Sequence, residues 1–180
     1  YLRNGELNPN IMGVVYSLNA YTGDKNTYTK LKELYHKAKL QEEKNRLLAA
    51  LSTFKQEDLL KETLRFSMSK DVKIQDKLYG ILGVSSNTYS KDMAWKFFKE
   101  NFDEIYKIYK HTSHIMPNLI KGLCAKFSTM EKYIEVKEFF NKNKVPSAKR
   151  AIAQSLEAIK INYNFVKANE KYLKEFFSNK

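Results

Sequence analysis

The chain has 180 residues, of which 43% are hydrophobic, which is enough for a buried core in one domain of ordinary size. Its single cysteine excludes a disulfide framework. It also has no apolar run long enough for a signal peptide or a membrane span, so we expect a cytoplasmic protein with no membrane partner. The net charge of +12 favours nucleic acid at first sight. However, 28 of the 32 basic residues are scattered lysines, and we expect no nucleic-acid partner.

Apolar residues recur at helical spacing along almost the whole chain, and the alternation typical of strands never persists. Each of the three prolines stands where a helix would begin, and short polar stretches separate the other segments. In chain order, the predicted helices span residues 9–21, 24–38, 41–52, 56–69, 73–85, 90–110, 116–127, 129–143 and 147–177. The sequence therefore predicts an all-α protein.

The predicted helices form pairs at a regular interval. The pairs begin near residues 8, 41, 73, 115 and 147, which gives steps of 33, 32, 42 and 32 residues. This spacing is typical of antiparallel helix pairs stacked into an α-solenoid, a superhelix of the HEAT or armadillo kind. The segment 147–177 is either one long helix or two abutting ones, and would cap an open end of the stack.

A charged cluster begins the predicted helix 41–52. Glu42 and Glu43 lie in its first turn, where acids offset the helix dipole, and Glu42 precedes Arg46 by four residues, the favourable order for an ion pair. Arg46 shares this helix with apolar Leu47 and Leu48, so it could be partly buried and orient the adjoining helices. The functional alternative is that Arg46 binds a substrate carboxylate.

Aromatic residues recur along the segment AWKFFKENFDEIYKIYK, at positions 95, 98, 102, 106 and 109. Such a stripe on a helix usually faces the core. A platform that stacks on a ligand, with Trp95 as its largest ring, is the alternative.

Metal and nucleophile chemistry would have to use His111, His114 and Cys124. Two histidines three residues apart can share a helix face, but a zinc site needs three or four ligands, and the sequence contains no HExxH or CxxC. Cys124 stands among apolar residues and is better explained as a core residue than as a nucleophile. Because phosphate-binding and nucleophile-elbow motifs are also missing, we predict no catalytic residue and no metal ligand in this chain.

Five segments occur in an order and spacing that resemble a known family. They are LQEEKNRLLAALS, LLKETLRFSMSKDVKIQD, AWKFFKENFDEIYKIY, FSTMEKYIEVKEFF and PSAKRAIAQSLEAIKIN. Over nearly its whole length, the chain resembles the C-terminal helical domain of zinc aminopeptidases related to puromycin-sensitive aminopeptidase and the archaeal tricorn-interacting factors. It departs from them at Ser90-Lys91, where they usually have Gly-Arg, at Asn101-Phe102, where they have Asn-Trp, and at Phe165, where they have Trp.

The resemblance implies that residues 1–180 are part of the C-terminal helical-repeat domain of a larger enzyme, which removes N-terminal residues from peptides. In that family, catalysis and its zinc belong to a separate domain whose HExxH and accompanying motifs do not occur here. The resemblance therefore implies no cofactor in this chain and zinc in the parent enzyme. The implied partners are the peptide substrate and the catalytic domain of the same polypeptide.

The resemblance also implies a role for particular residues. In the family, the concave side of the solenoid closes over the active-site chamber, and basic residues there receive the C-terminal end of the peptide. On this basis we expect Arg46, Lys91 and Arg150 to bind the substrate, with Trp95 as aromatic lining. Lys91 keeps a positive charge but not the planar fork of arginine. The alternative is a free-standing helical-repeat scaffold that binds protein partners, and an HExxH motif upstream in the same reading frame would distinguish the two.

Overall fold

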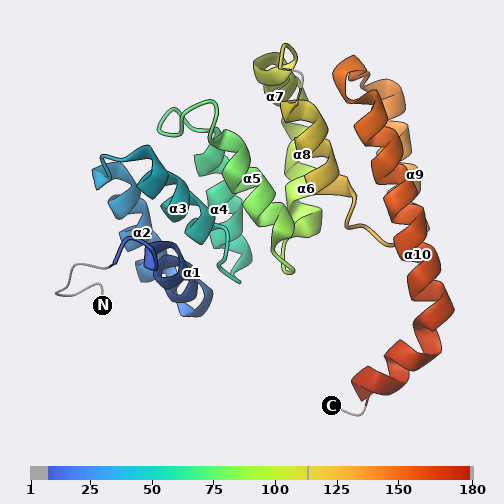
Figure 1. Cartoon of the computed structure of the whole chain (residues 1–180), viewed down its shortest axis with the longest axis horizontal. Coiled ribbons are helices and arrows are strands. Elements are labelled where there is room, and N and C mark those ends of the chain that lie inside the picture. The colour runs from blue at the N-terminus through green and yellow to red at the C-terminus, as the bar shows by residue number, and fades with distance from the viewer. Residues whose placement is uncertain (1–7, 113, 179–180) are drawn as a thin grey trace. The chain divides into compact units, whose positions relative to one another are not determined.

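A computed structural model describes residues 8–112 and 114–178 of the chain, apart from the side chain of Lys91. Every regular element in these ranges is helical, which confirms the all-α prediction (Figure 1). The helices are α1 (Met12–Thr22), α2 (Lys25–Lys37), α3 (Gln41–Leu51), α4 (Glu57–Met68), α5 (Lys77–Ser86), α6 (Lys91–Glu100), α7 (Phe102–Tyr109), α8 (Ile115–Cys124), α9 (Met130–Lys142), the 3₁₀ turn η1 (Pro146–Ala148) and α10 (Lys149–Ser178). They fall into two compact units, Tyr1–Glu100 (unit 1) and Asn101–Lys180 (unit 2).

In unit 1, the first helices of successive pairs lie side by side, since α3 packs against both α1 and α5 (Figure 1). The contacts run in the same direction along α1 and α3. A Cβ added to Gly13, near the beginning of α1, would lie 3.8 Å from Cγ of Arg46 in the middle of α3. Further along both helices, Oγ1 of Thr53, just after α3, donates to the carbonyl of Ser17 in the middle of α1 at 3.2 Å. Helices α1 and α3 are therefore parallel neighbours.

The second helices of the pairs form another layer of unit 1. Nζ of Lys32 in α2 lies 2.8 Å from Oε1 of Glu62 in α4, and the Tyr35 ring meets Phe66 edge to face at 5.1 Å between centroids. Helix α4 in turn packs against α5 and α6. Unit 1 is thus a stack of the helix pairs α1–α2, α3–α4 and α5–α6, the packing that the α-solenoid prediction requires.

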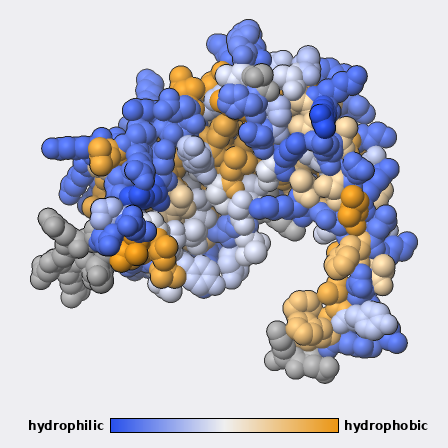
Figure 2. Space-filling model, viewed as in Figure 1, coloured by the Kyte–Doolittle hydropathy of each residue, from blue (hydrophilic) through white to orange (hydrophobic). Residues whose placement is uncertain are grey.

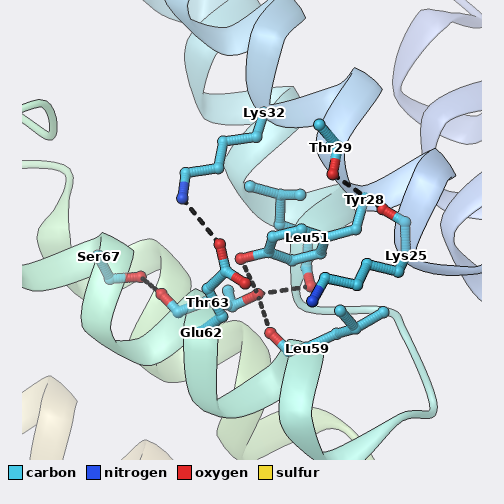
Figure 3. A network of polar contacts seen from close by, with 9 residues as sticks. All are labelled: Lys25, Tyr28, Thr29, Lys32, Leu51, Leu59, Glu62, Thr63 and Ser67. Atoms are coloured by element: carbon cyan, nitrogen blue, oxygen red, sulfur yellow. Dashed lines mark hydrogen bonds and ion pairs between the residues drawn. The ribbon is translucent and has the colours of Figure 1, made fainter.

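A buried polar network joins α2, α3 and α4 (Figure 3). Oγ1 of Thr63 lies within hydrogen-bonding distance of the carbonyls of Leu51 (3.0 Å) and Leu59 (2.9 Å), and 3.3 Å from the hydroxyl of Tyr28. Both Thr63 and Tyr28 are buried. Ser67, one turn further along α4, donates to the carbonyl of Thr63 at 2.7 Å. This polar network fixes the register of the stacked helix pairs, which also share an apolar core.

In unit 2, α8 packs against the first half of α10, and α9 packs against α10 as well. The buried residues of α10 are Ala151, Ser155 and Ile159. Beyond Ile159 no described residue of this helix is buried, and Figure 2 shows apolar side chains exposed along its free end. Among the described residues, no helix combines the length and the apolar character needed to cross a bilayer.

The structure corrects two helix boundaries. The single helix predicted at 90–110 is wrong, because Asn101, with φ −113° and ψ 18°, leaves the helical conformation and separates α6 from α7. Its carbonyl accepts a hydrogen bond from the Ile105 amide at 3.1 Å, so Asn101 is the N-cap residue that precedes α7. The helix predicted at 73–85 begins only at Lys77, after a turn in which the Asp76 amide donates to the Lys73 carbonyl at 2.8 Å. The segment after Pro146, by contrast, forms one long helix.

Candidate functional site

The C-terminal ends of α1, α3 and α5 meet in unit 1 around a pocket of about 380 Å³, which we call the tyrosine pocket. Its lining combines aromatic rings with small and polar side chains from the helix ends and from the loop after α5. The lining residues are Tyr21, Ala49, Ser52, Thr53, Gly83, Ser86, Asn87, Thr88 and Tyr89.

Asn87 fixes the loop that forms one side of the tyrosine pocket. Its Nδ2 donates to the carbonyls of Ser52 (2.9 Å) and Phe54 (2.7 Å), which the end of α3 would otherwise leave without partners. Its Oδ1 accepts from the Tyr89 amide at 3.0 Å. Gly83 lets α5 approach α3 closely, because a Cβ there would lie 2.1 Å from Oγ of Ser52. The pocket is therefore built by specific close contacts.

Two exposed tyrosines flank the tyrosine pocket. Tyr21 is 48% exposed and Tyr89 is 58% exposed. Nζ of Lys55 lies over the Tyr21 ring, 3.7 Å from its centroid, so a cation stands beside the pocket. Aromatic faces, hydroxyl groups and an ammonium group therefore lie close together at the surface of unit 1.

Arg46 has two carboxylate partners on its own helix. Its guanidinium forms an ion pair with Glu42, as the i,i+4 spacing predicts, and lies 3.5 Å from Oε2 of Glu43. Glu43 also accepts a hydrogen bond from the Tyr16 hydroxyl of α1 at 2.5 Å. Burial raises the pKa of Tyr16, and the hydrogen bond to Glu43 raises it further. Arg46 therefore belongs to a polar contact that holds α1 against α3.

The other residues predicted from the sequence lie in different surroundings. Trp95 of α6 is fully buried and stacks on Phe98, with 5.6 Å between the ring centroids. Lys91 is the first residue of α6, two positions after Tyr89, but its side chain lies outside the described part of the structure. Arg150 is exposed in the first turn of α10, in unit 2. The aromatic stripe is divided by Asn101, and its described rings are mainly core residues, as the simpler interpretation predicts.

Cys124 is buried at the end of α8, which confirms its interpretation as a core residue. Burial raises the pKa of its thiol far above the ordinary value, so the group stays protonated and is a poor nucleophile. In the ranges that the structure describes, no three His, Cys, Asp or Glu side chains lie together in a way that could hold a metal ion.

Sequence reasoning missed the tyrosine pocket and its adjacent cation, Lys55. A signal was present in three polar helix ends, Tyr21-Thr22-Gly23, Ser52-Thr53 and Ser85-Ser86-Asn87-Thr88-Tyr89, each of which follows an apolar helix. Only the parallel packing of α1, α3 and α5 brings these ends together, and periodicity within one helix does not predict such packing.

Comparison with known proteins gives consistent matches. The family model of the ERAP1-like C-terminal domain matches residues 1–161. Aminopeptidase M1-B of Oryza sativa subsp. japonica is 32% identical over 147 residues, which cover 82% of this chain and 16% of that protein. Aminopeptidase M1 of Arabidopsis thaliana is 32% identical over 152 residues, 84% of this chain and 17% of its own length. Human aminopeptidase N is 26% identical over 179 residues, 97% of this chain and 18% of its own.

The chain therefore spans less than a fifth of the length of these relatives. The matches confirm the resemblance to the C-terminal helical domain of the aminopeptidases that the sequence indicates. The chain belongs to the family of ERAP1-like C-terminal domains.

Proposed function

We propose that residues 1–180 form part of the C-terminal, non-catalytic domain of a zinc-dependent aminopeptidase that removes N-terminal residues from peptides in the cytoplasm. The family match and the three relatives, all called aminopeptidases, support this proposal. The zinc and the catalytic residues would belong to another domain of the same polypeptide. This chain would bound the substrate chamber and bind part of the peptide.

The tyrosine pocket is the observation that carries the peptide-binding role. Its tyrosine rings can pack against peptide side chains, and its hydroxyl groups can pair with the peptide backbone. Lys55 stands over Tyr21, and Lys91 follows the pocket loop by two residues. A peptide that enters the catalytic domain with its N-terminus first would leave its carboxylate for one of these lysines. A charge-assisted hydrogen bond of this kind contributes roughly 1.5–3 kcal/mol.

The remaining candidates take different parts in this proposal. Arg46 stabilises the contact between α1 and α3 through its two glutamate partners. It would bind a peptide carboxylate only by giving up one of these ion pairs. Trp95 positions α6, and with it Lys91, from within the core. Arg150 is exposed and makes no ion pair in the described part of the chain, so it is available as a further cation for the substrate.

Assays of activity and metal content test whether catalysis and zinc belong to another domain of the polypeptide. We expect the purified chain to bind no stoichiometric zinc and to hydrolyse no aminoacyl reporter, because its described residues include no set of three possible ligands. The full polypeptide that contains it should do both, and a chelator should abolish its activity. One tightly bound zinc per isolated chain, with chelator-sensitive hydrolysis, would contradict the proposal.

A further inference from the structure

A second cavity, which we call the lysine pocket, lies in unit 2 between the end of α9 and the beginning of α10. Its volume is about 360 Å³. The lining consists of cations at the surface and apolar side chains beneath them. The lining residues are Lys137, Phe140, Asn141, Lys144, Val145, Pro146, Lys149, Ile152 and Leu156.

The floor of the lysine pocket is apolar. Phe140 and Val145 are buried, with 5% and 4% of their surface exposed. Ile152 and Leu156 are half-buried and lie four residues apart, so they share one face of α10. An apolar group that entered the pocket would cover side chains that are now only partly shielded from water.

Among the described residues, no carboxylate forms an ion pair with the cations of the lysine pocket. Lys137, Lys144 and Lys149 are all exposed, none of them forms an ion pair in the described part of the chain, and no Asp or Glu lines the pocket. Other lysines of the same two helices are paired. Nζ of Lys132 lies 2.9 Å from Glu135, and Nζ of Lys174 lies 2.7 Å from Glu170. The positive charge at this pocket is therefore locally uncompensated.

The local sequence concentrates this charge. No acidic residue occurs between Glu138 and Glu157, whereas the same stretch carries Lys142, Lys144, Lys149 and Arg150. Helix α10 consequently has no acid in its first turn. Its first two residues are basic and lie at the positive end of the helix dipole, which is unfavourable for the folded chain alone. A bound anion would relieve this repulsion.

We propose that the lysine pocket binds a small amphipathic carboxylate, with an unbranched acyl chain of about eight to twelve carbons. The carboxylate lies among the lysines and the acyl chain covers Ile152 and Leu156. The volume is near the lower end of the range for small-molecule sites, which favours a medium-length chain. This site uses no residue of the tyrosine pocket and does not depend on the peptide-binding proposal.

Decanoate, kept below the concentration at which it aggregates, is the direct probe. We expect calorimetry with the 180-residue chain to show one saturable site, and amide spectra of the labelled chain to shift at Val145, Ile152 and Leu156. Decanol, which lacks the charge, should bind at least about tenfold more weakly because it loses the charge-assisted contacts. Hexanoate should bind more weakly as well, by roughly fourfold for each methylene lost from the apolar floor.

A charge-matched pair of variants distinguishes this pocket from general attraction to a basic protein. The double variant Lys144→Gln/Lys149→Gln should weaken decanoate binding at least about tenfold. The control, Lys167→Gln/Lys171→Gln, removes the same charge from exposed positions of α10 outside the pocket and should change it less than about twofold. Circular dichroism verifies that both remain folded. Equal binding of decanoate and decanol, equal losses in the two variants, or no binding to the unaltered chain would overturn the proposal.

Discussion

Thr63 is the residue on which the buried contact among α2, α3 and α4 most depends. Replacing it with valine keeps its shape but removes the hydroxyl that lies against the carbonyls of Leu51 and Leu59. We expect Thr63→Val to lower the free energy of unfolding by about 1–3 kcal/mol, because a buried carbonyl loses its partner. The matched control is Thr29→Val. Thr29 also bonds the carbonyl four residues back, at 3.0 Å, but it is exposed, so its loss should cost less than about 0.5 kcal/mol. Equal losses in urea unfolding would contradict this account.

Buried tyrosines should make the fold sensitive to alkali. Burial is the main cause that raises the pKa of Tyr28 and of Tyr35 above the ordinary value of 10.0. Each folded-state pKa lies above its unfolded value, so the stabilisation is fully present below pH 10 and is lost as the pH rises further. We expect the free energy of unfolding to fall above pH 10, and to fall less steeply in Tyr28→Phe. Identical slopes for the two proteins would exclude Tyr28 as a cause.

Cys124 provides a probe of the core of unit 2. Its thiol is fully buried, and burial raises its pKa. We expect a thiol reagent at pH 8 to modify the native chain at least about a hundredfold more slowly than the chain in denaturant. The rate of absorbance change gives both values directly. A native thiol that reacts as fast as the denatured one would show that Cys124 is accessible and that its environment differs from the one described.

Among the helical elements, α10 is joined to α8 by a contact that repeats one in unit 1. Nδ2 of Asn162 donates to the carbonyls of Ala125 (2.9 Å) and Phe127 (3.0 Å), as Asn87 does at the end of α3. Asn162→Ala should cost about 1–3 kcal/mol, because two carbonyls at a helix end lose their partner. Asn169→Ala, which removes an exposed hydrogen bond within α10, should cost much less. Denaturant unfolding of the two variants compares them, and equal costs would contradict the role of Asn162.

The exposed apolar side chains at the free end of α10 should make the isolated chain self-associate. Its large apolar side chains Ile161, Phe165, Val166, Tyr172, Phe176 and Phe177 are all at least 40% exposed. Exposed apolar surface of this extent promotes association and binds hydrophobic dyes. We expect Phe165→Ser/Phe177→Ser to reduce both dye fluorescence and the apparent mass in sedimentation, with little change in stability. A strictly monomeric chain that binds no dye would contradict this expectation.

The helices were predictable because each buries an apolar face, and the helical spacing of apolar residues within each segment indicates that face. The break at Asn101 was not predicted, since no proline or glycine marks it and the apolar spacing continues across it. At the site, the ion pair of Arg46 with Glu42 followed from their spacing on one helix. The tyrosine pocket did not, because Tyr21, Thr53 and Asn87 meet only through packing between helices that are distant in sequence.

At the scale of the whole molecule, the three matched relatives are each about six times as long as the region aligned with this chain. The two binding sites that we propose are distinct. The tyrosine pocket of unit 1 would hold the end of a peptide, while the lysine pocket of unit 2 would bind a small amphipathic acid. Both pockets are formed at the ends of helices, where side chains and backbone groups have fewer partners within the helix.

The most direct test of the peptide-binding role is the KM of the full polypeptide for one peptide in two forms, with a free or an amidated C-terminus. We expect amidation to raise KM by about tenfold, which corresponds to one charge-assisted contact. Of the variants Lys55→Ala and Lys91→Ala, the one that removes the lysine bound to the carboxylate should raise KM for the free acid similarly. Lys30→Ala, which removes an exposed lysine of α2, should not. A single-residue reporter, too short to reach the pocket, should be hydrolysed equally by all. Equal KM values for the free and amidated peptides in the unaltered enzyme would contradict the account.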